Sequence, residues 1–199
     1  MKIGKNYIDL KSFTRKAPKK IKDEFGVAFI TGYQGSGKTY FAVYNVAQFF
    51  KDLKIKTNIK SLNIPNATIE YFEYLDDITD DIEEYCVYVI DEISKKYTKE
   101  ARQDKKLYSW LQQSRKRKRY VFLITQEYLQ IPMWLRGIAS VVYTTKKIPL
   151  TPIFKTIKGI PFLDDQTKEW GVEPINVIIY KRNVKFSKMY DTFEPVNVL

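Results

Sequence analysis

Short apolar runs recur along the first three quarters of the chain, each bounded by polar residues or glycine. The continuous runs are FGVAFITG (25–32), CVYVID (86–91), YVFLIT (120–125) and SVVYTT (140–145). Runs of this length with such boundaries are typical of strands that are buried on both faces. A fifth segment, KIKTNI (54–59), alternates between polar and apolar residues, which also indicates a strand. The pattern therefore predicts at least five strands.

Between these runs, apolar residues recur at the spacing of an α-helix. Residues 37–51 are apolar on most sides, which predicts a helix in the middle of the fold. Residues 99–116 place one apolar face at helical spacing, formed by Leu107, Trp110, Leu111 and Ser114. Residues 70–84 contain eight acidic residues and no Lys or Arg, and we expect a solvated helix over 76–85. A turn and a short helix are predicted for 128–139.

Strands that alternate with helices predict an α/β domain with a mostly parallel sheet and helices on both faces. After Pro149 the pattern becomes β-rich, and INVIIYKR (175–182) is its clearest strand. We therefore expect a basic arm (1–24), a core (25–149), and a small β-rich extension and tail (150–199) that belong to one domain.

The amino-acid composition limits which partners and which kinds of active site are possible. The 199 residues are 44% hydrophobic, as in a globular protein, and 34 Lys and Arg against 23 Asp and Glu give a net charge of +11. This charge favours a polyanionic partner, either nucleic acid or a membrane surface. The chain has no His and a single cysteine, Cys86, which excludes His bases, an internal disulfide and Cys-based zinc sites. No apolar run is long enough for a membrane span and no secretory signal is visible, so a cytoplasmic location is expected.

The stretch GYQGSGKT (32–39) fits the phosphate-loop pattern G-x-x-x-x-G-K-[ST]. It follows a predicted strand and begins a predicted helix, so backbone N–H groups and the helix dipole should face a phosphate. Lys38 is expected to reach the β- and γ-phosphates, and the Thr39 hydroxyl to bind Mg²⁺. The residues expected to contact the nucleotide are Gly32, Gln34, Gly35, Ser36, Gly37, Lys38, Thr39 and Tyr40. The alternative is a simple glycine-rich turn.

Two further strand ends carry polar side chains. The strand VYVI ends in Asp91 and Glu92, so we expect Asp91 to hold Mg²⁺ through water and Glu92 to act as general base on an attacking water. The alternative for this acidic pair is simple exposure to solvent. Gln126 ends the strand YVFLIT, where its amide would lie near the γ-phosphate. Adjacent acids favour water as the nucleophile, and hence hydrolysis over transfer to a metabolite.

These three elements together resemble the FtsK–HerA superfamily of P-loop ATPases, ring-forming motors that include viral genome-packaging ATPases. The match rests on GYQGSGKT, on VIDE with Asp91 and Glu92, on the strand ending at Gln126, and on the basic segment 114–119 before that strand. It covers about residues 25–145. The short chain is similar to compact packaging ATPases of tailless, membrane-containing viruses. Zot-like assembly ATPases of filamentous phages share the layout but typically continue into a membrane span.

This resemblance implies a RecA-like P-loop fold, ATP and Mg²⁺ as cofactors, and a homo-oligomeric ring, often a hexamer, with ATP between subunits. The leading expectation is an ATP-hydrolysing translocase that packages a viral genome into a preformed capsid. It would grip double-stranded DNA by its backbone and work in the host cytoplasm or docked at a capsid vertex or portal. The alternatives are a Zot-like assembly or secretion ATPase acting on protein at a membrane, a small-molecule kinase, and a non-catalytic scaffold.

Ring ATPases usually take an arginine from the neighbouring subunit to stabilise charge that develops on the γ-phosphate. Five consecutive basic residues, 115–119, precede the strand that ends at Gln126. If the helix over 99–116 continues, Arg115 and Arg117 fall on the two flanks of its apolar face, and Lys116 points away. Arg115 is the first candidate for this catalytic role. The rival candidates are Arg117, Arg119 and Arg136.

Overall fold

The structure, a computed structural model, describes residues 25–191. The basic arm 1–24 and the tail end 192–199 lie outside the described residues. The strands are β1 (Gly26–Thr31), β2 (Lys54–Thr57), β3 (Ile69–Tyr71), β4 (Cys86–Ile90), β5 (Tyr120–Ile124), β6 (Val141–Lys147), β7 (Ile153–Leu163) and β8 (Trp170–Lys181). The α-helices are α1 (Lys38–Asn45), α2 (Asp76–Thr79), α3 (Lys105–Gln112), α4 (Met133–Arg136) and α5 (Val184–Ser187). A π-helical turn, η3 (Val46–Phe50), continues α1.

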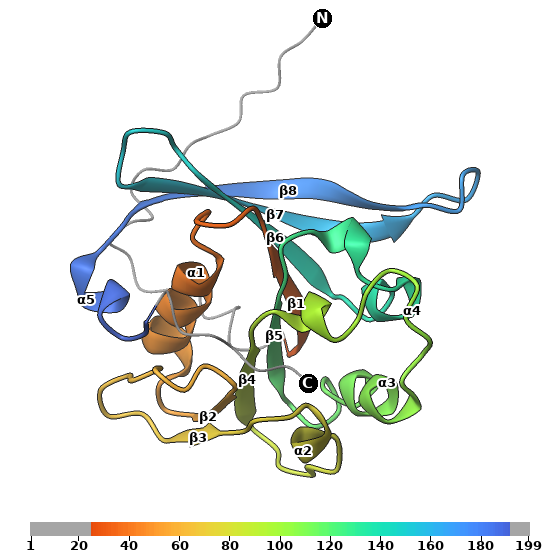
Figure 1. Ribbon diagram of the computed structural model, residues 1–199, viewed down its shortest axis with the longest axis horizontal. Coiled ribbons are helices and arrows are strands. Elements are labelled where there is room, and N and C mark those ends of the chain that lie inside the picture. The colour runs from red at the N-terminus through yellow and green to blue at the C-terminus, as the bar shows by residue number, and fades with distance from the viewer. Residues whose placement is uncertain (1–24, 192–199) are drawn as a thin grey trace, which may run out of the picture.

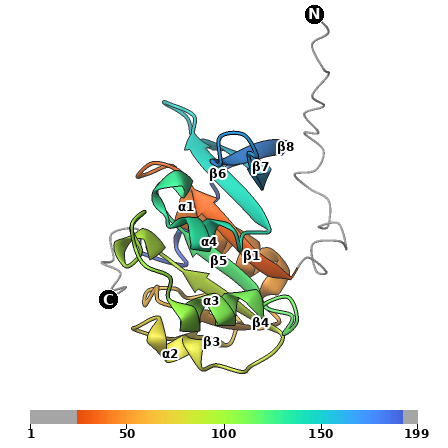
Figure 2. The same cartoon turned by 90° about the vertical axis from the view of Figure 1, so that its right-hand side faces the viewer.

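All eight strands form one sheet in the order β3-β2-β4-β5-β1-β6-β7-β8. The pairs from β3 to β6 are parallel, whereas β6–β7 and β7–β8 are antiparallel. Figure 2 shows β6, β7 and β8 at one end of the sheet, and β3 with α2 at the other. The predicted α/β class with a mostly parallel sheet is confirmed, and the β-rich segment after Pro149 forms a long hairpin.

Helices cover both faces of the sheet, as predicted (Figure 1). On one face, α1 and α5 pack against a core that includes Ile30, Val87 and Phe122. On the other face, α2, α3 and α4 enclose a second core, which includes Phe29 and Leu123. Strands buried on both faces explain why their sequences are continuously apolar instead of alternating.

Two predicted helices are shorter than expected. The segment predicted as a helix over 76–85 is helical only at α2, because Asp81 leaves the helix to accept hydrogen bonds from Lys56 and from Tyr88. The helix predicted over 99–116 begins at α3, where the Asp104 carboxylate accepts from the Leu107 N–H at 3.0 Å and caps the first turn. Turns replace its last residues, 113–116, and continue to residue 118.

Candidate active site

The phosphate loop, residues 32–39, lies where β1 ends and α1 begins. Gly37 has a φ of 91°, a conformation that side chains other than glycine rarely adopt, and a Cβ there would lie 2.7 Å from the Phe154 ring. Ser36 shares a hydrogen bond of 2.9 Å with Thr145 of β6. The antiparallel strands β6 and β7 therefore support the loop from one side, a contribution that the sequence motif alone does not show.

Lys38 is held at the rim of this loop. Its ammonium donates to the carbonyl oxygens of Gly32 at 2.8 Å and Tyr33 at 3.1 Å. Burial lowers the pKa of Lys38, while the nearby carboxylates of Asp91 and Glu92 act in the opposite direction. A positive charge that is partly desolvated and bound only by neutral carbonyls is available to an anionic phosphate.

Thr39 and Asp91 meet across the carboxyl edge of the sheet. The Thr39 hydroxyl donates to the Asp91 carboxylate at 3.0 Å. Burial raises the pKa of Asp91, and the hydrogen bond from Thr39 counteracts this rise. The described residues hold no group of three or more His, Cys, Asp or Glu that could bind a metal alone. One hydroxyl and one carboxylate suit Mg²⁺, which normally takes few protein ligands and completes its shell with phosphate oxygens and water.

Asn58, the residue directly after β2, fixes the backbone of Asp91, which follows the neighbouring strand β4. Its side-chain amide donates to the Asp91 carbonyl at 3.0 Å and accepts from the Asp91 N–H at 2.8 Å. These two hydrogen bonds fix the position of the Asp91 backbone relative to β2, and therefore the point from which its carboxylate projects. We did not predict Asn58, because the strand was expected to run over 54–59, whereas β2 ends at Thr57 and leaves Asn58 directly after it.

Glu92 follows in a left-handed conformation, with a φ of 56°. A non-glycine residue held in this region stores strain of about 1–3 kcal/mol, which is often found at functional sites. The Glu92 carboxylate forms an ion pair with Lys95, one turn along the chain. This ion pair engages one oxygen of the Glu92 carboxylate, Oε2, and the role of Glu92 as general base stays a prediction.

Gln126 lies two residues after the end of β5, the strand that lies between β4 and β1. Its carbonyl accepts from the Gly32 N–H at 2.9 Å, and its side chain is exposed. Thr39 at the start of α1, Asp91 after β4 and Gln126 after β5 therefore lie at one edge of the sheet. The side chain of Tyr40 does not join them, because it is only 2% exposed and its hydroxyl accepts from the Asn183 N–H. Our expectation that Tyr40 contacts the nucleotide can thus involve only its backbone.

The four arginine candidates lie in different surroundings. Arg119 is 0% exposed and donates to the carbonyls of Glu83 and Asp81 at 2.6 Å each, so it cannot reach a neighbouring subunit. Arg136 is also buried, at 6% exposed. Burial within their own subunit counts against both candidates, and the choice of an arginine that acts across subunits stays a prediction.

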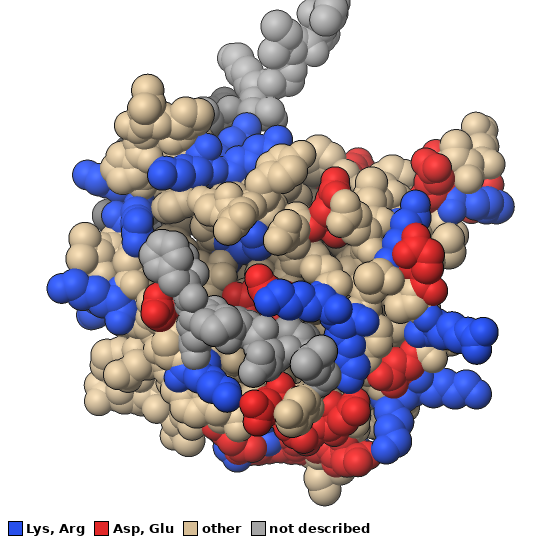
Figure 3. Space-filling view, in the orientation of Figure 1, with Lys and Arg blue, Asp and Glu red and all other residues tan. Residues whose placement is uncertain are grey.

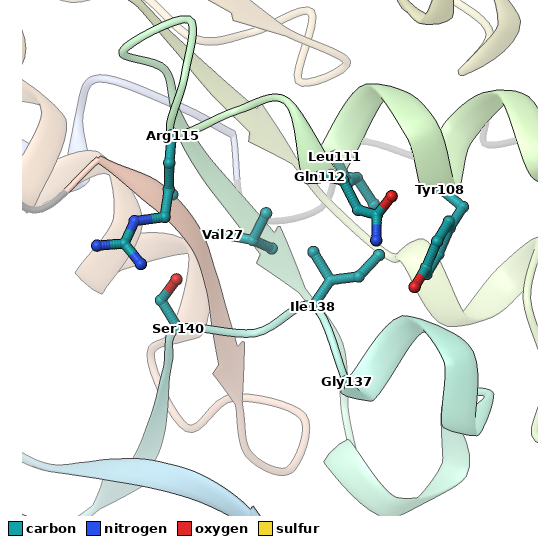
Figure 4. A pocket seen from close by; sticks show the side chains of 9 residues that line it. Val27, Tyr108, Leu111, Gln112, Arg115, Gly137, Ile138 and Ser140 are labelled. Carbon is teal, nitrogen blue, oxygen red and sulfur yellow. The ribbon is translucent and has the colours of Figure 1, made fainter.

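Arg117 is half-buried and donates to the Ile82 carbonyl at 2.7 Å, while Arg115 is exposed. Arg115 lies beside Gly26, where β1 begins, and lines a cavity of about 200 Å³ with Val27 and Ser140 (Figure 4). The phosphate loop follows the other end of β1, about 20 Å away at 3.3 Å per residue. Arg115 cannot reach the phosphate site of its own subunit, so a role across a subunit boundary stays a prediction.

Comparison with known families adds the decisive observation. A family model described as Zot, zonular occludens toxin, matches residues 26–193. The chain belongs to the Zot family. A search of curated proteins found no match.

Two solved structures are similar to this chain. The N-terminal domain of zonular occludens toxin from Neisseria meningitidis has a TM-score of 0.61 and 21% identity, covering 83% of this chain and 98% of that chain. The genome packaging NTPase B204 from Sulfolobus turreted icosahedral virus 2, in complex with AMPPCP, has a TM-score of 0.49 and 13% identity, covering 75% of this chain and 98% of that chain. The similarity to the Zot domain supports the P-loop fold that the sequence predicted.

Within residues 25–191, no helix is both long and apolar enough to cross a membrane.

Proposed function

We propose that this Zot-family chain hydrolyses ATP with Mg²⁺ and uses the energy for phage assembly or secretion. The observation that carries the proposal is the contact between Thr39 and Asp91, with Glu92 as the next residue. A hydroxyl from the phosphate loop and a buried carboxylate from a second strand form a small, polar Mg²⁺ site. Such a site is suited to a nucleotide that brings its own phosphate ligands.

Each residue of this edge has a separate task in the proposed reaction. Lys38 exchanges its carbonyl partners for phosphate oxygens and offsets their charge. Glu92 leaves Lys95, orients a water molecule in line with the γ-phosphate and accepts its proton. The Gln126 amide holds the same water from the neighbouring strand. Bound Mg²⁺ would neutralise charge on the phosphate oxygens.

The family match supports assembly over genome packaging, which was our leading expectation from sequence. That ranking rested on the short chain and on the lack of an apolar run long enough to span a membrane. A family model matched over residues 26–193 is a more specific observation than either. DNA translocation remains the second candidate, because the net charge of +11 favours a polyanionic partner. The host cytoplasm is our proposed location in both cases.

We also propose that the chain acts as a homo-oligomeric ring, with Arg115 reaching the ATP of a neighbour. Its distance from its own phosphate loop supports this assignment. An inactive Arg115→Ala protein should recover part of its activity when mixed with Lys38→Ala subunits, because each defect then lies on a different side of the interface. No recovery at any mixing ratio would remove Arg115 from the mechanism.

An assay that measures phosphate release from ATP distinguishes between the candidate functions. Wild type should hydrolyse ATP only with Mg²⁺, and Lys38→Ala should be inactive, while Lys51→Ala, an exposed lysine outside the site, serves as the control. Turnover that is unchanged by double-stranded DNA supports the assembly function. Stimulation by DNA that weakens steeply with salt supports translocation. No Mg²⁺-dependent hydrolysis under any condition would contradict the proposed activity.

A further inference from the structure

Two surfaces at opposite ends of the sheet combine exposed apolar side chains with opposite charges. In Figure 3, Lys and Arg side chains gather at the upper left, over one end of β7 and β8. Asp and Glu side chains gather along the lower rim, over β3 and α2. Because β3 and β8 are the two edge strands, these surfaces lie as far apart as the sheet allows.

The basic face lies on the side of the sheet that α3 and α4 cover. The register of β6, β7 and β8 places Thr144 beside Ile157 and Val177, and Lys146 beside Lys155 and Ile179. We define the basic face as Lys146, Ile153, Lys155, Ile157, Val177, Ile179 and Lys181. Alternation along the strands puts all seven on one side of the hairpin.

The helices of this side cover only the far half of the hairpin. Val172 packs against the core beneath α4, and a Cβ on Gly137, the residue after α4, would lie 3.3 Å from the Trp170 ring. Closer to the phosphate loop, Val177 is 42% exposed, and Ile157 and Ile179 are only half-buried. The basic face thus presents aliphatic side chains and lysines to solvent.

The acidic face surrounds β3 and α2. We define it as the exposed residues Glu70, Tyr71, Glu73, Tyr74, Asp76, Asp77, Asp80, Ile82, Glu84 and Tyr85. Ile82 is 73% exposed, which is unusual for so apolar a side chain. Nearby lysines pair with Glu70 at 2.6 Å, Glu73 at 3.4 Å, Asp76 at 3.2 Å and Asp80 at 4.0 Å. Exposed pairs of this kind are weak, and the face keeps an excess of negative charge.

We propose that the basic face of one copy docks onto the acidic face of the next copy. Each face offers apolar side chains within a charged rim, the composition of a protein–protein interface. Opposite charges on the two faces of one chain make a second copy the complementary partner. A nucleic acid would match the lysines of the basic face, but it would leave the aliphatic side chains without a partner. Because the two faces differ, the contact is head-to-tail and produces a ring if the rotation closes.

This inference extends the ring of the proposed function, but its test measures association and not hydrolysis. Lys155→Glu/Lys181→Glu leaves one lysine against two carboxylates on the basic face, so both faces are then acidic. The acidic face has six carboxylates and four lysines paired with them, Lys54, Lys60, Lys96 and Lys106, so Asp80→Lys/Glu84→Lys leaves four carboxylates against six lysines, and both faces are then basic. Neither variant should associate with itself, because like charges would oppose each other, and the dissociation constant should rise at least about tenfold. An equimolar mixture of the two should associate as wild type does, because every contact again joins opposite charges.

Sedimentation velocity of the full chain over a concentration series, at low and high salt, measures these outcomes. Wild type should associate at low salt and dissociate at high salt. Two controls with equal charge changes elsewhere on the exposed surface, Lys51→Glu/Lys116→Glu and Asp52→Lys/Glu100→Lys, should associate as wild type does. Ile82→Ser and Val177→Ser test the apolar part without a charge change, and each should weaken association.

Several results would overturn the proposal. One is a monomeric wild type at every concentration, and another is normal self-association of either reversed variant. A third is failure of the mixture when both variants keep the circular dichroism and melting temperature of wild type. If Lys155→Glu/Lys181→Glu loses affinity for a short DNA duplex but associates normally, the basic face serves nucleic acid and not a second copy.

Discussion

Arg119 should stabilise the fold and take no part in catalysis across subunits. Its guanidinium donates to the carbonyls of Glu83 and Asp81, and it lies 5.7 Å from the Tyr88 ring centroid and 5.2 Å from that of Trp110. It thereby ties the acidic loop after α2 to the strands β4 and β5. Replacing Arg119 with alanine removes both hydrogen bonds and leaves two carbonyls without this donor.

The size of the effect follows from these contacts. A hydrogen bond from a charged donor contributes about 1.5–3 kcal/mol, so two contribute about 3–6 kcal/mol. Losing the contacts with the two rings adds to the loss, while removing a buried charge offsets part of it. We therefore expect Arg119→Ala to lower the free energy of unfolding by about 3–5 kcal/mol. With an m-value of about 2–3 kcal/mol per molar urea, the midpoint should fall by roughly 1–2.5 M.

Urea unfolding followed by tryptophan fluorescence measures this shift. Arg115→Ala is the matched control, because it makes the same chemical change at an exposed position and should alter stability by less than about 0.5 kcal/mol. Any loss of ATP hydrolysis in Arg119→Ala should follow the unfolded fraction. A normal midpoint combined with lost hydrolysis would refute the structural role and return Arg119 to the catalytic candidates.

Two further predictions concern the acidic loop and the phosphate loop. Burial raises the pKa of Asp81, but hydrogen bonds, first that from Lys56, outweigh it and hold the pKa at about 2, below the ordinary 3.8. The stabilisation of the fold by ionised Asp81 is complete above about pH 4 and is lost towards pH 2. Between these pH values, the urea midpoint should therefore fall less in Asp81→Asn than in wild type. An equal fall in both proteins would contradict the assignment. Gly37→Ala should weaken ATP binding in a fluorescent-nucleotide titration more than Gly35→Ala, because both have positive φ but only the Gly37 Cβ would meet Phe154. Equal losses would show that the Phe154 contact is unimportant.

The sequence predicted the parallel core of the fold because those strands are buried on both faces and read as unbroken apolar runs. The helices predicted over 99–116 and 76–85 are shorter in the structure. Their ends are set by the cap at Asp104 and the side-chain hydrogen bonds of Asp81, which depend on partners that hydrophobic periodicity does not specify. The strand β3 was missed because three residues carry too little pattern.

The part of the candidate site that the sequence predicted consists of polar side chains that follow the ends of strands. Thr39 contacts Asp91, and Gln126 lies at the same edge of the sheet, because parallel strands finish on the same side. The arginines were harder to place, because one basic run contains the buried Arg119 and the exposed Arg115, which differ only in tertiary contacts.

Glu92 provides the most direct test of the proposed hydrolysis. In a single-turnover assay with Mg²⁺ and ATP, Glu92→Gln should bind nucleotide with near wild-type affinity but hydrolyse it about 10²- to 10⁴-fold more slowly, because the water loses its base. Lys95→Ala is the informative companion, since it frees Glu92 from its ion pair and should retain hydrolysis. Retained ATP binding with lost turnover in Glu92→Gln alone is the result that we predict. Normal turnover in Glu92→Gln would contradict the mechanism.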